Sequence, residues 1–518
     1  MGEADSLQAQ VLDFMGRPQA YSPPPATVER IETHGSIVFL AGPFAYKVKR
    51  AVKYPFLDFS TLDKRRLACL NEIAVNSRTA PQLYLEVVPI TLGDTLRLGA
   101  AGKVVEWALR MRRFDEAKLY DRIAGEGRLS LSAMPVLAVV IAVFHASADR
   151  LLTPNQNVVP LEGVLLDNEG AFAANTDVFP PEAALELGRL SRERLAALAS
   201  LLRARAGTGY VRHCHGDLHL RNIVEIDGAP ILFDAIEFDD ALATIDVLYD
   251  LAFLLMDLGK RGLGAHANAV LNAYLDADGS TGNLVGLATL PLFLSMRAMI
   301  RAKVELLRAR TAAPAKTTAG AAARAYFELA RTFLAPPRRR LIAIGGLSGS
   351  GKSAISRAIA AHIGAFPGAV HVRSDVERKR LFGVTQDHRL PERAYAPEVT
   401  DQVYAMCRKR ARMALEGGQS VIIDAVHARL DERKALAALA AAQGVPFTGL
   451  WLEAPAEVMR ERIATRTGDV SDATPSVVDA QLGYDIGPQS FDIINASLPV
   501  AQVVAVCLGR IGATAEPR

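Results

Sequence analysis

Cysteine is scarce in this chain, and no two cysteines have the spacing of a metal or redox motif. The four cysteines among 518 residues, Cys69, Cys214, Cys407 and Cys507, stand far apart. This pattern argues against a disulfide framework and against a cysteine zinc site. A reducing compartment fits it best, so we expect a cytoplasmic protein.

The sequence also lacks an excess of charge of one sign. Its 59 Lys and Arg residues nearly balance its 56 Asp and Glu residues, for a net charge of +3. Composition therefore gives little reason to expect a nucleic-acid partner, although a local basic groove stays open. The most apolar stretches, Val136–Phe144 and Leu284–Ile300, are short or interrupted, so we expect buried helices and no membrane partner.

What the chain does have is length and apolar content. Half of its residues are hydrophobic and 22% are charged, which is typical of folded globular proteins. A chain of 518 residues is too long for one ordinary core, so two or more domains are expected. An Ala-rich and Arg-rich stretch that ends at Pro336 and Pro337 marks the boundary, and we expect few contacts to cross it.

The two sides of this boundary differ in pattern. Before it, short strand-like runs (Ile37–Leu40, Ala45–Val48, Tyr84–Ile90) precede long helical stretches from about Leu131. After it, LIAIGG, AVHVRS, SVIIDA and FTGLWLEA alternate with helical segments, as in a parallel sheet with helices on both faces. The predicted fold is an α+β bilobal domain followed by an α/β domain.

We predict the following ranges: a first domain over 1–335, with a small lobe at about 30–105, a connection at Val104–Phe114, a helical lobe at about 115–308 and a linker helix over 309–335, and a second domain over 338–518.

The strongest motif is GGLSGSGKS, which follows LIAI and precedes the helix-like SAISRAIAAHI. Gly346, Gly351, Lys352 and Ser353 have the GxxxxGK[ST] spacing of a P-loop. Backbone amides of such a loop point at phosphate oxygens, the lysine reaches the outer phosphates, and the serine hydroxyl ligates magnesium. We predict ATP binding by the whole loop, with Ser348, Gly349 and Ser350 as further members.

Two aspartates end strand-like runs downstream of this loop. Asp375 lies in RSDVERKR together with Arg378, where a carboxylate can orient a substrate hydroxyl. Asp424 closes VIID and can hold magnesium through water, although either aspartate can instead cap a helix. Further on, Arg462 and Arg466 lie four residues apart on one helical face, where they either close over the phosphates or face solvent.

This set resembles the P-loop kinases of the gluconate kinase and polynucleotide 5′-kinase type, over about Leu341 to Asn495. The resemblance implies that Asp375 is the base or hydroxyl-orienting residue and that Arg378 contacts the substrate. It also implies that Arg462 and Arg466 belong to a lid. It does not imply which acceptor is used.

A second set of catalytic residue types lies in the first half. HCHGDLHLRN places His215, Asp217 and Asn222 in an HxDxxxxN pattern, and the strand-like ILFD ends in Asp234. In kinase chemistry one aspartate orients the acceptor hydroxyl, while an asparagine and a second aspartate hold magnesium. Asp217 is therefore the predicted catalytic residue, and Asn222 and Asp234 are the predicted metal ligands.

Upstream, FAYKVKR places a lysine as in the VAIK pattern of kinases. Lys47 is the predicted nucleotide lysine, and Glu72 in a helix-like segment is its predicted partner. Lys49 shares the face of Lys47 by alternation, so the choice between them stays open.

This second set resembles the aminoglycoside phosphotransferase family over about Thr33 to Leu258, and the resemblance implies that Asp250 braces the catalytic loop. The order of the two halves is similar to that of bacterial fusions of such a domain with a P-loop domain. Two departures are that THGSIVFLAG lacks GxGxxG and that Asp234 follows Phe233 where DFG would place its aspartate first. The family name therefore does not imply antibiotic resistance.

Together these patterns predict a bifunctional kinase that uses Mg²⁺ and ATP at both sites and phosphorylates hydroxyl groups of small polar molecules. One alternative is a regulatory protein in which the P-loop domain is an ATPase or switch that gates the other domain. Another is a polynucleotide 5′-hydroxyl kinase, which the weak net charge disfavours.

Overall fold

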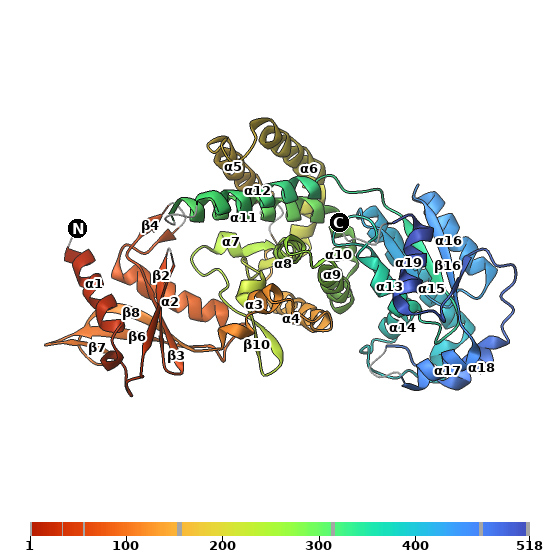
Figure 1. Cartoon of the computed structure of the whole chain (residues 1–518), viewed down its shortest axis with the longest axis horizontal. Coiled ribbons are helices and arrows are strands. Elements are labelled where there is room, and N and C mark those ends of the chain that lie inside the picture. The colour runs from red at the N-terminus through yellow and green to blue at the C-terminus, as the bar shows by residue number, and fades with distance from the viewer. Residues whose placement is uncertain are drawn as a thin grey trace. The chain divides into compact units, whose positions relative to one another are not determined.

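The computed structural model describes residues 3–33, 35–54, 57–152, 158–311, 316–465 and 470–513. The chain forms two compact units (Figure 1). The first contains residues 1–129, 144–151 and 209–250, and the second contains residues 130–143, 152–208 and 251–518. This division does not fall at Pro336, and the domain ranges drawn from the sequence remain a prediction.

The first unit is built on a six-stranded antiparallel sheet. The strand order is β1-β2-β3-β8-β6-β7. Its elements are α1 (Glu3–Met15), β1 (Val28–Glu32), β2 (Ser36–Ala41), β3 (Phe44–Lys49), α2 (Leu62–Asn76), β6 (Tyr84–Leu92), β7 (Leu96–Leu98) and β8 (Lys103–Arg112).

The helices α1 and α2 cover opposite faces of this sheet. Neighbouring residues of a strand point to opposite sides, so each packs against a different helix. Phe39 packs with Val11 and Met15 of α1, whereas Leu40 packs with Cys69 of α2. The strands expected around Ile37, Ala45 and Tyr84 are confirmed as β2, β3 and β6.

The expectation that Val104–Phe114 connects two lobes is wrong for most of its length. Residues Lys103–Arg112 form β8, which lies between β3 and β6 in the sheet. Its pattern of buried and exposed residues is that of an interior strand, and the chain leaves the sheet only at Arg113.

The part of the first unit that contains the predicted catalytic loop is built from short pairs of strands. β9 (Val211–His213) pairs with β12 (Thr244–Asp246), and β10 (Ile223–Ile226) pairs with β11 (Ala229–Leu232). The 3₁₀ turn η3 (Leu220–Asn222) leads into β10, and α3 (Tyr120–Gly125) packs beside it.

The second unit combines helices from before Pro336 with a five-stranded parallel sheet after it. The strand order β14-β15-β13-β16-β17 confirms the predicted parallel sheet. The sheet part contains β13 (Leu341–Gly345), α13 (Lys352–Ala360), β14 (Val370–Arg373), α14 (Ser374–Leu381), α15 (Pro397–Glu416), β15 (Val421–Asp424), α16 (Leu430–Ala442), β16 (Phe447–Glu453), α17 (Ala456–Thr465), α18 (Pro475–Leu482), β17 (Asp492–Asn495) and α19 (Val500–Ile511).

Two groups of helices contact this sheet. α13 and α19 pack together over a core that includes Ile344, Ile359 and Leu508. α15 contacts β14 and β15 and also packs against α14 and α16. This arrangement brings the carboxyl ends of β13, β14 and β15 to one edge, where Gly345, Arg373 and Asp424 end the strands.

The helices before Pro336 in this unit include α5 (Val159–Ala173), α6 (Pro181–Gly207), α9 (Gly264–Asp278), α10 (Thr281–Gly286), α11 (Leu290–Thr311) and α12 (Lys316–Phe333), while α4 (Ala133–Ser147) and α8 (Val247–Lys260) are shared with the first unit. The expectation of few contacts across Pro336 is wrong within this unit, because α9 contacts α13 and β14 and α10 contacts α15.

Among the residues that the structure describes, one helical segment, Thr281–Arg308, has the length and apolar composition to cross a membrane. Of its most apolar window, 78% is buried inside the structure. This helical segment is longer than the apolar stretch Leu284–Ile300 seen in the sequence. Its burial agrees with the buried helix that was expected there.

Candidate active sites

Lys47 lies in an ion-pair cluster of the first unit. Its Nζ lies 2.7 Å from Glu72 Oε1 and 2.9 Å from Asp234 Oδ1. Lys49 Nζ lies 2.6 Å from the other oxygen of Glu72 and also pairs with Glu237. The two lysines therefore share one carboxylate, and of the two only Lys47 also pairs with Asp234.

Opposite charges hold Lys47 and Glu72 ionised in spite of burial. Burial lowers the pKa of Lys47, but Asp234 and Glu72 outweigh it and hold that pKa well above its usual value. Burial likewise raises the pKa of Glu72, but the two lysines lower it to about 2. Glu72 and Lys47 are thus both charged near neutral pH.

The predicted catalytic loop brings Asp217 and Asn222 together. Asn222 Nδ2 donates to Asp217 Oδ2 at 3.0 Å and to the Asp217 carbonyl at 2.9 Å. The side-chain amide oxygen of Asn222 is the atom that can bind a metal ion. His219 Nε2 lies 3.4 Å from Asp217 Oδ2.

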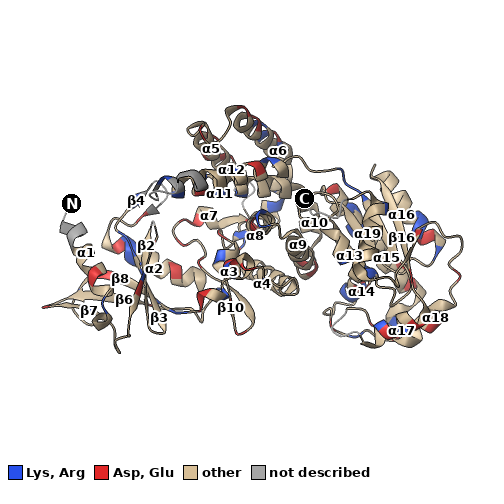
Figure 2. Ribbon diagram, in the orientation of Figure 1, with Lys and Arg blue, Asp and Glu red and all other residues tan. Residues whose placement is uncertain are grey.

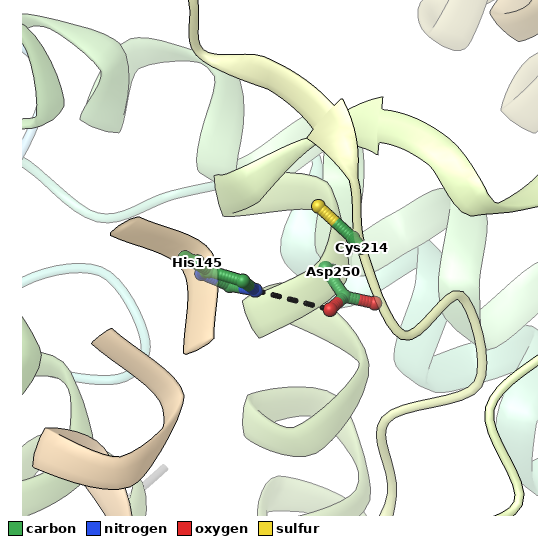
Figure 3. Close-up of side chains that lie close together, drawn as sticks. All are labelled: His145, Cys214 and Asp250. Atoms are coloured by element: carbon green, nitrogen blue, oxygen red, sulfur yellow. Dashed lines mark hydrogen bonds and ion pairs between the residues drawn. The ribbon is translucent and has the colours of Figure 1, made fainter. Parts of the chain in front are cut away.

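Asp250 supports the start of this loop from below. It accepts the backbone N–H groups of His215 at 3.1 Å and Gly216 at 2.9 Å. His145 Nε2 lies 3.1 Å from the same carboxylate, and Cys214 lies beside it (Figure 3). The bracing role that the family resemblance implied for Asp250 agrees with these contacts.

Asp234 has a left-handed backbone, with φ of 59°. Its N–H donates to the Tyr84 hydroxyl at 3.0 Å, and the N–H of Ala235 donates to Asn76 Oδ1 at 2.8 Å. Asn76 ends α2 four residues after Glu72, so α2 both supplies the partner of Lys47 and fixes the segment of Asp234. No short motif marks Tyr84, Asn76 or Glu237, so these residues were not predicted from the sequence.

In the second unit, the P-loop forms between β13 and α13. A Cβ on Gly346 would lie 2.5 Å from the Leu452 carbonyl oxygen, and one on Gly349 would meet the Met459 carbonyl oxygen. Both glycines also have positive φ, so the loop needs glycine at these two positions. The Ser348 N–H donates to Gln481 Oε1 of α18 at 2.7 Å.

The predicted metal ligands of this site contact each other directly. Ser353 Oγ donates to Asp424 Oδ2 at 2.6 Å, and His371 Nε2 lies 3.2 Å from the same oxygen. Burial raises the pKa of Asp424, but the hydrogen bond from His371 and nearby cations hold it below its usual value. A hydroxyl and an ionised carboxylate are hard oxygen donors, so this pair fits magnesium.

A cavity of about 1250 Å³ opens over the P-loop. Asp375 and Arg378 line it with Lys352, Ser353, Asp424 and Arg462. Arg378 is buried: its NH1 donates to the Ala394 carbonyl at 2.6 Å, and its guanidinium lies 4.8 Å from the centre of the Tyr395 ring.

The two arginines predicted for a lid have different outcomes. Arg462 reaches the P-loop, where its NH1 donates to the Ser350 carbonyl at 3.4 Å and its NH2 donates to the Ala496 carbonyl at 2.8 Å. Arg466 lies outside the described residues. Lys352 Nζ donates to the Leu347 carbonyl at 2.9 Å, so it lies against its own loop.

Asp472 connects the segment after α17 with the opposite wall of the cavity. It accepts the Tyr395 hydroxyl at 2.7 Å and the Leu390 N–H at 3.0 Å, and it pairs with Lys379 at 3.2 Å. The contacts of Asp472 were not predicted from the sequence.

The chain is similar over most of its length to mycobacterial proteins. Uncharacterized proteins of Mycobacterium tuberculosis and Mycobacterium bovis are each 30% identical to it over 469 residues, which are 88% of this chain and 90% of each relative. The chain belongs to the family of these proteins. Within this family member, residues 110–284 match the phosphotransferase enzyme family and residues 341–484 match an AAA domain.

Among solved structures, the chain is similar to a choline/ethanolamine kinase family protein from Mesorhizobium loti, with 14% identity, a TM-score of 0.39, and coverage of 63% of this chain and 95% of that one. It is also similar to a sugar kinase from Janibacter, with 20% identity, a TM-score of 0.26, and coverage of 35% and 97%. The family matches support a phosphotransferase with a P-loop ATP-binding domain.

Proposed function

We propose that this family member is an ATP-dependent phosphotransferase with two nucleotide sites, each of which transfers the γ-phosphate to a hydroxyl group of a small polar acceptor. The proposal places one site in the phosphotransferase-like first domain and the other in the P-loop domain. It also places the protein in the cytoplasm.

The observation that carries the proposal is the position of Lys47 between Glu72 and Asp234. Active kinases need the lysine that binds the phosphates paired with a helix carboxylate, and they need an aspartate that holds magnesium. In this chain the three groups come from β3, α2 and the segment after β11. Lys47 Nζ lies 2.7 Å from Glu72 Oε1 and 2.9 Å from Asp234 Oδ1. Lys47, rather than Lys49, is therefore the proposed nucleotide lysine.

Transfer at the first site would use the catalytic loop. Asp217 would orient the acceptor hydroxyl and accept its proton, while Asn222 and Asp234 would hold magnesium. Asn222 Nδ2 donates a hydrogen bond to Asp217 Oδ2, which helps to fix the orientation of the Asp217 carboxylate. Bound magnesium would neutralise charge on the phosphates.

At the second site the P-loop amides and Lys352 would bind the phosphates, and Ser353 and Asp424 would hold magnesium. Asp375 would orient the acceptor hydroxyl from the wall of the cavity, and Arg378 would contact the acceptor. Arg462 and Arg466 would stabilise charge on the transferred group, a role supported for Arg462 by its contact with Ser350.

The proposed acceptors are small molecules and not nucleic acid. Figure 2 shows residues of both signs along both units, and the net charge is only +3. A nucleic-acid groove depends on a concentration of Lys and Arg that neutralises many phosphates.

The experiment that tests the proposal is a screen of fractionated metabolites with γ-labelled ATP and the full chain. We expect label to appear in a small molecule, and we expect different acceptors for the Asp217→Asn and Lys352→Ala variants. Label that appears only as free phosphate, at a rate that no fraction raises, would contradict transfer.

A regulatory role is the second candidate, because α9 contacts α13 and β14 of the P-loop domain and α10 contacts its α15. In that case the P-loop site would hydrolyse ATP without an acceptor, and Lys352→Ala would change the transfer rate of the first site. The same screen separates the two functions.

A further inference from the structure

β14 is an edge strand of the parallel sheet, because only β15 pairs with it among the described residues. The outer side of an edge strand presents backbone N–H and C=O groups without strand partners. In this sheet, side chains of α9 contact that outer side. α9 precedes Pro336 in the chain, so a helix from the first predicted domain covers an edge of the second.

Two asparagines one helical turn apart make this contact. Asn268 Nδ2 and Asn272 Nδ2 both donate to the Ala369 carbonyl at 3.1 Å. Asn272 Oδ1 also accepts the His371 N–H at 2.7 Å. Asn272 therefore matches a donor and an acceptor of the strand, as a neighbouring strand would, whereas Asn268 satisfies only the carbonyl.

The residue held by Asn272 is the one that contacts the candidate metal ligand. His371 is buried, and its Nε2 lies 3.2 Å from Asp424 Oδ2, the oxygen that also accepts the Ser353 hydroxyl. Groups that orient a metal ligand set both its position and its affinity for the metal. A continuous chain of contacts thus runs from Asn272 through His371 to Asp424.

The end of α9 makes a second contact, with the helix that carries the candidate catalytic residue of the P-loop domain. Arg380 of α14 donates to the Asp276 carbonyl at 3.2 Å, and its guanidinium lies 3.6 Å from the Asp276 carboxylate. Asp375 lies in the first turn of the same α14. α9 therefore contacts both β14 and α14, the two elements that carry His371 and Asp375.

We propose that α9 is a positioning element of the P-loop site and that Asn272 is its positioning residue, acting through His371 on the magnesium ligand Asp424. This inference rests on the proposed function of the P-loop site. It means that the metal site of the second domain is fully ordered only when a helix of the first domain lies against it.

Calorimetric titration of the full chain with a non-hydrolysable ATP analogue, at a series of Mg²⁺ concentrations, tests this proposal. All proteins carry Asp234→Ala, which disables the first site. We expect Asn272→Ala to raise the Mg²⁺ concentration needed for half-maximal binding by about 3- to 10-fold, less than the loss typical of a direct neighbour of a ligand. Asn268→Ala is the matched control, because it removes one donor to Ala369 and the acceptor of Asn272 Nδ2 on Asn268, but leaves in place Asn272 Oδ1, the acceptor of the His371 N–H.

Two further measurements separate positioning from simple packing. Hydrogen exchange of the peptide 369–373 should rise in Asn272→Ala, because the His371 N–H loses its acceptor. The effect of Asn272→Ala on the Mg²⁺ requirement should disappear in a His371→Phe background, because residues that act through one contact are not additive.

The outcomes are distinct. If the Asp234→Ala protein with an intact P-loop does not bind the analogue with Mg²⁺, the proposed function of the site fails. If it binds but Asn272→Ala and Asn268→Ala shift the Mg²⁺ requirement equally, or neither shifts it, the positioning role is overturned. Full additivity with His371→Phe would also overturn it.

Discussion

The two candidate sites solve the problem of holding charge in different ways. In the first unit, Lys47 is held by Glu72 and Asp234, so its charge is balanced by carboxylates of the protein before any ligand arrives. In the second unit, Lys352 donates to a loop carbonyl, and Gly346 and Gly349 leave no room for a side chain. The phosphate binding proposed there would use backbone amides of the loop. Nucleotide binding at a site built on ion pairs should change with charge and pH. Nucleotide binding at a site built on backbone geometry should change with the loss of single groups.

The strongest test of this contrast is Lys352→Ala. Since Lys352 is the cation expected to reach the outer phosphates, we expect the number of analogue molecules bound per full chain to fall from two to one, with about 100-fold weaker binding at the second site. Titration calorimetry measures both quantities. Lys434→Ala, an exposed lysine of α16, should leave both sites unchanged. Retention of two sites in Lys352→Ala would remove the P-loop assignment.

Asp217→Asn tests the first of the two sites. We expect nucleotide binding to stay near its original affinity and phosphate transfer by the first site to fall by about 10²- to 10⁴-fold, because a base is lost while the ion pairs of Lys47 remain. Transfer is followed with labelled ATP once an acceptor is known. Asp63→Asn, an exposed aspartate of α2, is the control. An equal loss of affinity and rate would mean that Asp217 is structural.

Lys47 and Lys49 allow a paired test within the first site. We expect Lys47→Met to weaken nucleotide binding, because Lys47 contacts Asp234. Lys49→Met should instead lower the free energy of unfolding by about 3 to 5 kcal/mol, because it leaves the buried Glu72 and Glu237 with one cation fewer. Calorimetric titration and denaturant unfolding separate the two effects. The reverse pattern would exchange the roles of the lysines.

The pH dependence of unfolding gives a smaller effect. Glu72 has a folded-state pKa of about 2 against 4.5 for an unperturbed side chain, because Lys47 and Lys49 outweigh its burial. A lowered pKa stabilises the fold above pH 4.5, and this contribution of about 3 kcal/mol is lost as the pH falls toward 2. We expect Glu72→Gln to flatten the loss of stability between pH 5 and pH 3, measured by denaturant unfolding. An unchanged slope would mean that Glu72 is not ionised in the folded state.

The smallest expected effect is that of Asp472→Asn. This change weakens the pair with Lys379 but keeps an acceptor for Tyr395, so we expect a loss of about 1 kcal/mol in unfolding free energy. Acceptor affinity should change more than nucleotide affinity, because Tyr395 lies against Arg378. A larger change in nucleotide affinity would place Asp472 with the phosphate site instead.

Local motifs predicted the parts of both sites that depend on a short stretch of chain. The P-loop, the pairing of Lys47 with Glu72 and the meeting of Asp217 with Asn222 all follow from spacing within or between recognisable segments. The alternation of short apolar runs with helical segments also located the strands β13, β14, β15 and β16 of the parallel sheet.

The contacts that were missed depend on tertiary packing. Tyr84 and Asn76 hold the segment of Asp234 through single hydrogen bonds, and no pattern around either residue marks that role. Residues of β8 were expected to form a connection, because the sequence alone does not show that they pair with β3 and β6. Asn268 and Asn272 of α9 belong to no recognisable motif in the sequence. Their contacts with β14 depend on how the chain folds.

The two tryptophans of the chain fall one to each unit, which gives the protein a pair of natural optical reporters. Trp107 belongs to β8 and lies under the guanidinium of Arg66, 5.2 Å from its ring centre. Trp451 belongs to β16 and packs so closely on Gly345, the last residue before the P-loop, that a Cβ there would lie 2.9 Å from the indole. In a Trp107→Phe background, the fluorescence of the remaining indole would follow events at the phosphate loop alone, without any attached dye.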